Sequence, residues 1–245
     1  RVAVDLEGNL YITSQASFFS VRKITPAGVV TTFVGNGTAG STDGTGTNAT
    51  VRWPAGMTVD SSGNIYVADT GNNCVRVIER NYVYDASKNI IAINGIIGTL
   101  VGTAPTLTSS NSGSGVRLNA PRGVAVDSSG CVYISDTGNH RICKVTSGGA
   151  FVTLAGCTTL HAPLAYVPGI NNGTGQEASF RFPTGLTVDL KGNVFVADTG
   201  NNVIRRITPS GKVSTVAGGG QPFFKEGRRE SAYFNQPVGI TVDLH

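Results

Sequence analysis

The sequence predicts an all-β protein, a β-propeller of four-stranded antiparallel blades. Two observations lead to this fold class. The twenty residues "PRGVAVDSSGCVYISDTGNH" at 121–140 repeat with small changes at 54–73 and 183–202, and their Val–Asp pair recurs every 54 to 67 residues. A period of this length is typical of propellers and solenoids. Within each copy the apolar residues alternate or form short runs, as in strands, and do not follow the period of a helix.

Each copy divides into four strands in order. In the copy that starts at Pro121, "GVAVD" is the first strand, an Asp-x-x-Gly turn follows, and "CVYISD" is the second strand. Asp accepts hydrogen bonds from turn amides, and Gly takes the positive φ that such a turn needs. The turn "TGN" leads to the third strand, "RICKV", and turns such as "TPAG" and "TPSG" precede a fourth strand like "FVTLAG". Such a meander buries both of its faces against neighbouring blades.

The repeated pattern G-[IVLM]-[AT]-V-D-x-x-G-[NC]-[IV]-[YF]-[VI]-[AS]-D-T-G-N closely resembles the NHL repeat. The segments "ATVRWPAG", "ASFRFPTG" and "SAYFNQPVG", which precede first strands, extend the likeness over almost the whole chain. The resemblance implies a propeller, and propellers of this family usually close with six blades. We expect one NHL-type domain over 1–245 that is a piece of a longer chain. Its repeat units span about 1–53, 54–120, 121–182 and 183–236, with a partial unit at 237–245.

The first copy departs from the pattern. Ser14 replaces the Asp of the second turn, and Phe18 and Phe19 stand where the other copies have Asn-Asn or Asn-His. We therefore expect this blade to keep its strands but to build its second turn differently. Two linkers, at 102–120 and 155–182, and the hairpin at 79–98 are longer than their counterparts.

Composition narrows the possible functions. Charged residues make up only 14% of the chain and there are 33 glycines, which fits buried strands joined by uncharged turns. The net charge of +4 is small and its basic residues are scattered, so nucleic acid is not a favoured partner. We find no apolar run long enough to span a membrane and no signal peptide.

Three N-x-[ST] sequons, at Asn36, Asn48 and Asn172, lie in Gly/Thr-rich segments and are glycosylation candidates. They favour a secreted glycoprotein of the extracellular space or the secretory pathway. The four cysteines show no zinc spacing. Cys74 and Cys157 are expected on the face of the second turn and the linker, which makes them disulfide candidates. Free core thiols are the alternative for all four, and four cysteines permit three pairings.

The repeated aspartates raise the question of a metal site. Those that end each first strand would lie at one height around a channel, where carboxylates could bind a hard cation. We favour the simpler interpretation that each aspartate caps its own turn, and we interpret the Asp of each "DTGN" in the same way. The first-strand aspartates are Asp5, Asp60, Asp127, Asp189 and Asp243.

No catalytic constellation is recognisable. Some propellers that resemble this one are lyases that hold zinc through several channel-facing histidines. Here His140, His161 and His245 fall in a turn, a linker and the terminus, and a zinc site cannot be assembled from them. The Gly-rich stretch "GNGTAG" at 35–40 is followed by no helix that could hold a dinucleotide. We predict no catalytic residue, no metal and no cofactor, and keep as the alternative a lyase or hydrolase whose metal ligands lie outside this fragment.

A second alternative is a propeller that binds single-stranded RNA. The resemblance admits it, because some NHL propellers bind RNA on one rim through basic and aromatic residues. Basic residues recur on the third strand, but we expect them to neutralise neighbouring carboxylates and to cover apolar surface with their stems. The aromatic residues of the second strand are expected to pack between blades.

The leading hypothesis is a noncatalytic interaction or scaffold module. Its strand order places the "DTGN" turns and the interblade linkers on one face, where variable segments on a rigid scaffold commonly make contacts. We expect that face to bind a protein, a glycan or neighbouring copies. Exposed aromatics and arginines are typical of such contacts. The candidates are Asn73, His140, Arg141, Asn202, Phe223, Phe224, Lys225, Arg228 and Arg229.

Overall fold

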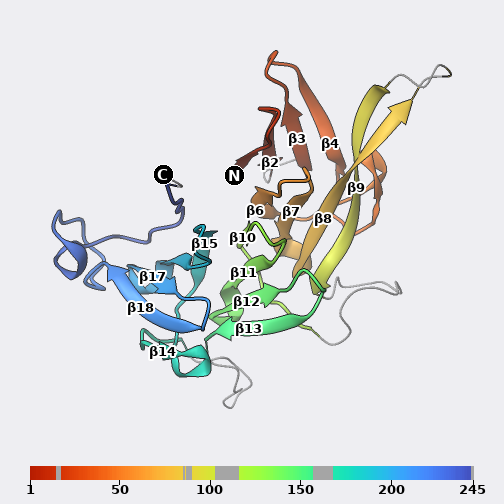
Figure 1. Ribbon diagram of the computed structural model, residues 1–245. Coiled ribbons are helices and arrows are strands. Elements are labelled where there is room, and N and C mark those ends of the chain that lie inside the picture. Colours follow the sequence, from red (N-terminus) through yellow and green to blue (C-terminus); the bar gives the residue numbers. More distant parts are fainter. Residues whose placement is uncertain (15–17, 85, 87–89, 103–115, 157–167, 244–245) are drawn as a thin grey trace. The chain divides into compact units, whose positions relative to one another are not determined.

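The computed structural model describes residues 1–14, 18–84, 86, 90–102, 116–156 and 168–243. The chain divides into two compact units, Arg1–Ala120 and Pro121–His245. Each unit contains two antiparallel sheets, which we call blades 1 and 2 in the first unit and blades 3 and 4 in the second (Figure 1). The helical segments of the described residues are single 3-10 turns of three residues.

Blade 1 is a meander of four strands paired in chain order. Blade 2 has four strands in the same order and a short fifth strand at its outer edge. The last two strands of its meander are much longer than the others and extend past them as a hairpin (Figure 1). Blade 1 contains β1 (Val2–Val4), β2 (Leu10–Ser14), β3 (Phe19–Ile24) and β4 (Val30–Gly37). Blade 2 contains β5 (Gly44–Thr45), β6 (Pro54–Val59), β7 (Ile65–Asp69), β8 (Cys74–Tyr84) and β9 (Ile90–Gly102).

The second unit repeats this plan. Blade 3 is again a four-stranded meander, and blade 4 again has an additional short strand. Blade 3 contains β10 (Gly123–Val126), β11 (Val132–Asp136), β12 (Arg141–Val145) and β13 (Phe151–Ala155). Blade 4 contains β14 (Gly173–Thr174), β15 (Pro183–Val188), β16 (Val194–Asp198), β17 (Val203–Ile207) and β18 (Lys212–Ala217).

The predicted fold class, an all-β propeller, is confirmed, with one correction. Blades 2 and 4 have five strands, because the linker that enters each blade contributes two residues to its outer edge. Gly44 pairs with Ile97 of β9, and Gly173 pairs with Val213 of β18. The added strand covers backbone groups that an outer strand would otherwise leave exposed. A single domain over 1–245 stays a prediction.

The core of each unit lies between its two blades. In the first unit Tyr11 and Phe33 of blade 1 pack with Ile65 and Ile78 of blade 2 around the linker residue Val51. In the second unit Phe180 occupies the position of Val51. It lies among Tyr133 and Ile142 of blade 3 and Val196 and Ile207 of blade 4. The second-strand aromatic residues of blades 1 and 3, Tyr11 and Tyr133, therefore pack between blades as predicted, whereas Tyr66 and Phe195 of blades 2 and 4 belong to neither cluster.

The first turn of each blade is fixed by the aspartate that ends the first strand. In blade 2, Asp60 Oδ1 accepts hydrogen bonds from the amides of Ser62 at 2.9 Å and Asn64 at 2.8 Å. Asp5, Asp127 and Asp189 accept the equivalent two amides. This bears out the interpretation that these aspartates cap their own turns.

Candidate interaction surface

The second turn of blades 2, 3 and 4 has one local geometry. Each "TGN" forms a single 3-10 turn that ends at a residue with left-handed backbone conformation, φ about +55°. These residues are Asn73, His140 and Asn202. Asn and His enter this region more readily than most residues, so the turn places a polar side chain where a β-branched residue would be strained.

The Asp of this turn holds the linker that enters its own blade. In blade 2, Asp69 Oδ1 accepts a hydrogen bond from the amide of Arg52 at 2.7 Å, and the amide of Gly71 donates to the carbonyl of Arg52 at 2.8 Å. In blade 4, Asp198 and Gly200 make the same two bonds to Arg181, both 2.8 Å long. The "DTGN" aspartate was predicted to cap its own turn. Its Oδ1 instead binds the amide of a linker residue 17 residues earlier, and its Oδ2 accepts from the Asn side chain of its own turn at 2.8 Å.

The other carboxylate oxygen pairs with a buried arginine of the third strand. Asp69 Oδ2 lies 3.2 Å from Arg76, and Asp198 Oδ2 lies 3.0 Å from Arg205; all four side chains are fully buried. Burial raises the pKa of the Asp69 and Asp198 carboxyls to about 6, against hydrogen bonds and arginine charges that lower it. The prediction that third-strand bases neutralise carboxylates is confirmed for these two arginines.

Blade 3 also pairs the aspartate of its second turn with an arginine, but the arginine comes from another position of the third strand. Cys143 occupies the arginine position of the third strand and is buried. Arg141, two residues earlier, pairs with Asp136 at 2.7 Å and is only 7% exposed. Arg141 was a candidate for the binding face, and its burial against Asp136 assigns it to the scaffold.

The left-handed residue of each turn holds the linker that leaves its blade. Its side chain accepts a hydrogen bond from the amide of the residue before the next proline. Asn73 Oδ1 accepts from Ala120 at 2.8 Å, His140 Nδ1 from Phe182 at 3.0 Å, and Asn202 Oδ1 from Gln236 at 2.9 Å. We call each of these three hydrogen bonds a linker clasp. His140 and Asn202 are each 8% exposed and Asn73 is half-buried. These three residues were predicted to bind a partner, but their side chains instead hold the backbone of the linker.

The linker residues held in this way project their own side chains outward. Trp53 is 51% exposed and Phe182 is 48% exposed, and each follows an exposed arginine, Arg52 or Arg181. The Arg52 guanidinium lies 5.1 Å from the centre of the Trp53 ring. We call Arg52–Trp53 and Arg181–Phe182 the two Arg–aromatic pairs. These residues were not among the predicted binding residues, although both pairs stand directly before the proline that begins a blade.

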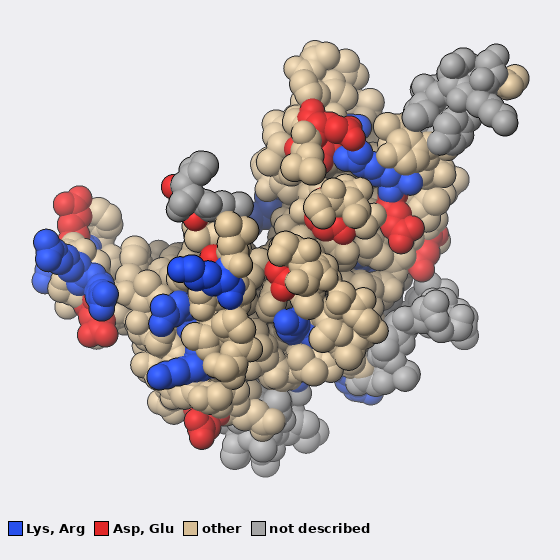
Figure 2. Space-filling view, in the orientation of Figure 1, with Lys and Arg blue, Asp and Glu red and all other residues tan. Residues whose placement is uncertain are grey.

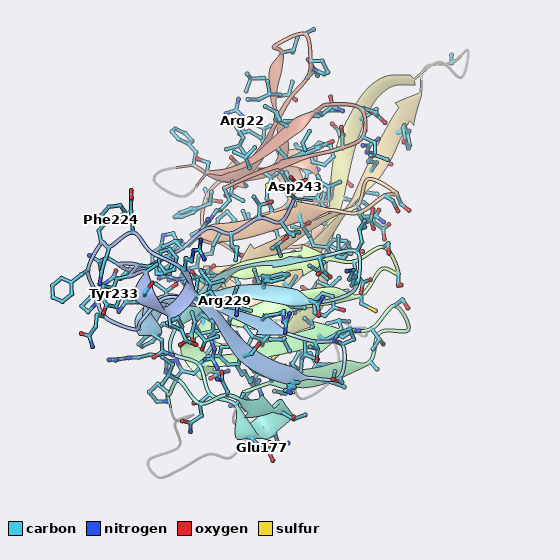
Figure 3. All side chains as sticks on the ribbon, turned by 60° about the vertical axis from the view of Figure 1, so that its left-hand side comes forward. Arg22, Glu177, Phe224, Arg229, Tyr233 and Asp243 are labelled. Carbon is cyan, nitrogen blue, oxygen red and sulfur yellow. The ribbon has the colours of Figure 1, made fainter. Side chains whose placement is uncertain are left out.

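The last linker exposes every residue that the sequence singled out there. Phe223 is 64% exposed and Phe224 is 86% exposed. Lys225, Arg228 and Arg229 are exposed as well, beside two glutamates, so basic and acidic side chains lie together on this loop (Figure 2). Figure 3 shows Phe224, Arg229 and Tyr233 on this loop, and the Lys225 ammonium lies 5.3 Å from the centre of the Tyr233 ring.

The three sequon asparagines are all exposed. Asn36 Oδ1 accepts hydrogen bonds from the amide and hydroxyl of Thr38 in its own sequon, at 2.9 and 2.6 Å. Asn172 Oδ1 accepts from the buried Arg205 at 3.0 Å. Asn48 ends the 3-10 turn Gly46–Asn48. Exposure is compatible with glycosylation, which stays a prediction at all three positions.

The cysteines divide between the core and the part of the chain that is not described. Cys74, Cys131 and Cys143 are buried and form no disulfide with one another, and burial raises the pKa of the Cys74 thiol to about 12. Cys157 lies outside the described residues, as do His161 and His245, so the Cys74–Cys157 disulfide stays a prediction. Across the described ranges, no three His, Cys, Asp or Glu side chains are grouped to hold a metal ion. No helix among those ranges is long and apolar enough to cross a membrane.

Blades built from one repeat and joined through their second turns define the chain as a β-propeller repeat protein. The family model of the NHL repeat matches residues 51–78, and that of the teneurin NHL domain matches residues 106–220. The chain belongs to the NHL-repeat family.

Individual proteins show the same relationship. The chain is 28% identical over 220 residues to Protein SUPPRESSOR OF QUENCHING 1, chloroplastic, of Arabidopsis thaliana, covering 87% of this chain and 20% of that protein. It is 28% identical over 222 residues to human teneurin-1, covering 84% of this chain and 8% of teneurin-1. The chain thus spans a small part of these relatives. An auxiliary nutrient binding protein from Bacteroides thetaiotaomicron VPI-5482 superposes with a TM-score of 0.63 at 17% identity, covering 99% of this chain and 53% of that one. This last likeness shows the fold alone.

Proposed function

We propose that this chain is a noncatalytic NHL-propeller module that binds a protein partner through its linkers. One observation carries the proposal: the second turns fix the backbone of the linkers while leaving large aromatic and arginine side chains exposed. Arg52 is held through both its amide and its carbonyl, yet its side chain and that of Trp53 are exposed. A rigid backbone that presents aromatic and arginine side chains has the features of an interaction hot spot.

Photo-cross-linking in the cells that make the full-length protein tests this function. p-Benzoylphenylalanine would replace Phe182 or Phe224, which are exposed on linkers, and in a control Leu190, which is 75% exposed in the first turn of blade 4. We expect protein adducts from the two linker positions and few from position 190. Equal adducts from all three positions, or none at the linkers, would contradict the proposal.

We further propose that the module lies in the extracellular space or the secretory pathway and carries glycans. The support is that all three sequon asparagines are exposed, while the relatives point to more than one location, since one of them is named chloroplastic. Intact mass before and after peptide N-glycosidase, with Asn36→Gln, Asn48→Gln and Asn172→Gln variants, tests this. We expect the enzyme to remove hexose-containing mass from the wild type, and we expect it to remove less mass from each variant. A mass unchanged by the enzyme would contradict the proposal.

A further inference from the structure

The two Arg–aromatic pairs are built to the same plan in separate units. Each arginine donates its amide to a buried aspartate and accepts from a turn glycine, with all four bonds between 2.7 and 2.8 Å. A Cβ on Gly71 or Gly200 would lie 2.8 or 2.7 Å from that arginine carbonyl, so only glycine allows the approach. The turn therefore fixes the arginine backbone on both sides.

The aromatic residue of each pair has an unusual backbone conformation. Trp53 has φ of 48° and Phe182 has φ of 47°, a region that bulky residues rarely adopt. For Phe182 the clasp from His140 holds the amide, and the two rings meet edge to face with centroids 4.4 Å apart. Trp53 meets Phe19 in the same way at 6.5 Å. Ala120 and Gln236, at the equivalent positions of the other two linkers, have the same conformation, with φ of 44° and 50°. The linker therefore imposes this conformation, and surrounding contacts hold it in place at Trp53 and Phe182.

The charges of both pairs are unpaired among the described residues. Neither the Arg52 nor the Arg181 guanidinium has a carboxylate partner there, because the adjacent Asp69 and Asp198 are buried and pair with Arg76 and Arg205. A guanidinium without a carboxylate partner, carried on a fixed backbone next to an exposed aromatic residue, matches a carboxylate next to an apolar side chain.

The pattern of the linkers argues against a polyanion. The positions equivalent to the Arg–aromatic pairs are Asn119–Ala120 before Pro121 and Asn235–Gln236 before Pro237. Two of the four linkers thus have no charge at this site. Single-stranded nucleic acid needs a basic groove that follows its backbone, with several stacking residues along it. Isolated arginine–aromatic pairs instead suit separate acidic side chains of a protein.

We infer that Arg52–Trp53 and Arg181–Phe182 are binding sites for acidic segments of a protein partner, each site taking an Asp or Glu carboxylate together with a neighbouring apolar side chain. This inference rests on the proposed function and gives its partner a chemistry. Because the backbone of each pair is already fixed, little conformational entropy is lost on binding.

Panning a random dodecapeptide phage library on the purified protein tests the inference. Enriched peptides would then be measured by fluorescence polarisation against the variants Arg52→Ala/Trp53→Ala and Arg181→Ala/Phe182→Ala. The matched controls are Leu6→Ala and Leu190→Ala, which alter side chains 88% and 75% exposed in first turns. Amide exchange of the core strands confirms that each variant is folded. A dodecauridine oligonucleotide serves as the polyanion probe.

We expect the enriched peptides to combine Asp or Glu with aromatic or aliphatic residues, and to bind a pair variant about tenfold more weakly than the wild type or the controls. Peptides that bind both pair variants as well as the wild type would overturn the inference while leaving the interaction module in place. Enrichment of no peptide at all would count against the module itself. Dodecauridine that binds in the submicromolar range, and is lost in the same variants, would show that the pairs are a nucleic-acid site instead.

Discussion

The two units fasten the same repeat in different ways. In the second unit, blade 3 holds the next linker through the His140 clasp, and Thr137 Oγ1 donates to the carbonyl of Pro183 at 2.6 Å. In the first unit, blade 1 has Ser14 in place of the turn aspartate, and Arg80 of blade 2 joins it from the other end of the strands. Arg80 pairs with Asp5 at 2.7 Å and Glu7 at 2.5 Å.

The buried arginine of the third strand also has more charged partners in the first unit than in the second. Arg76 of the first unit contacts two carboxylates, Asp69 and Asp43. Arg205 of the second unit has Asp198 as its carboxylate among the described residues, and its other hydrogen-bond partners are neutral oxygens. Where the repeat sequence degenerates, charge pairs take over the role of the turn. The repeat therefore requires a fixed junction between blades, but different contacts can fix that junction.

The largest effect is expected from removing the buried carboxylate of the second unit. Asp198→Ala leaves Arg205 buried without a carboxylate, which should lower the free energy of unfolding by about 3–5 kcal/mol. Asp69→Ala should cost less, because Arg76 keeps Asp43. Urea denaturation of both variants, with Leu190→Ala as the surface control, measures the difference. A larger loss for Asp69→Ala would contradict the comparison.

A smaller effect, confined to the first unit, is expected from Arg80→Ala. The variant removes two charged hydrogen bonds to blade 1, and Asp5 loses a partner while its side chain is 1% exposed, so we expect a loss of about 2 kcal/mol. Hydrogen exchange with mass spectrometry should show faster exchange in β1 and β2 and no change in β15 and β16. Faster exchange in both units would show that Arg80 does not act specifically on the contact between blades 1 and 2.

The smallest effect is expected from the His140 clasp, which depends on pH. Burial and the nearby Arg181 charge lower the pKa of His140, and Nδ1 must be unprotonated to accept from Phe182. At a pH between the lowered pKa of His140 in the folded state and its ordinary pKa in the unfolded state, the folded state binds fewer protons. The free energy of unfolding therefore falls as pH drops from the ordinary histidine value toward the lower folded one.

His140→Asn is the matched variant, because Asn holds this position in blades 2 and 4. It should keep the clasp at neutral pH and remove that part of the acid sensitivity, whereas His140→Ala should lose about 1 kcal/mol at neutral pH. Urea midpoints measured from pH 8 to pH 5 test this. Equal acid sensitivity in the wild type and His140→Asn would exclude the histidine as its source.

The repeat made the strands, their order and the capping aspartates such as Asp60 predictable, because each depends on residues close in sequence. Strands β5 and β14 were not predictable, since two residues carry no periodicity and their pairing partners lie far along the chain. The clasps were missed for the same reason: His140 and Phe182 are 42 residues apart. Exposure could not be predicted either, because the burial of Arg141 depends on its pair with Asp136, and the exposure of Trp53 depends on how its linker is held.

The most direct test of the account follows the three linker amides by hydrogen exchange and NMR. The variants Asn73→Ala, His140→Ala and Asn202→Ala remove one clasp each. Each should speed exchange of its own linker amide, that of Ala120, Phe182 or Gln236, by roughly fivefold to tenfold and leave the other two unchanged. Unchanged exchange at the matching amide would contradict the claim that the second turns fix the linkers, and at Phe182 it would also contradict the rigid presentation of the Arg181–Phe182 pair.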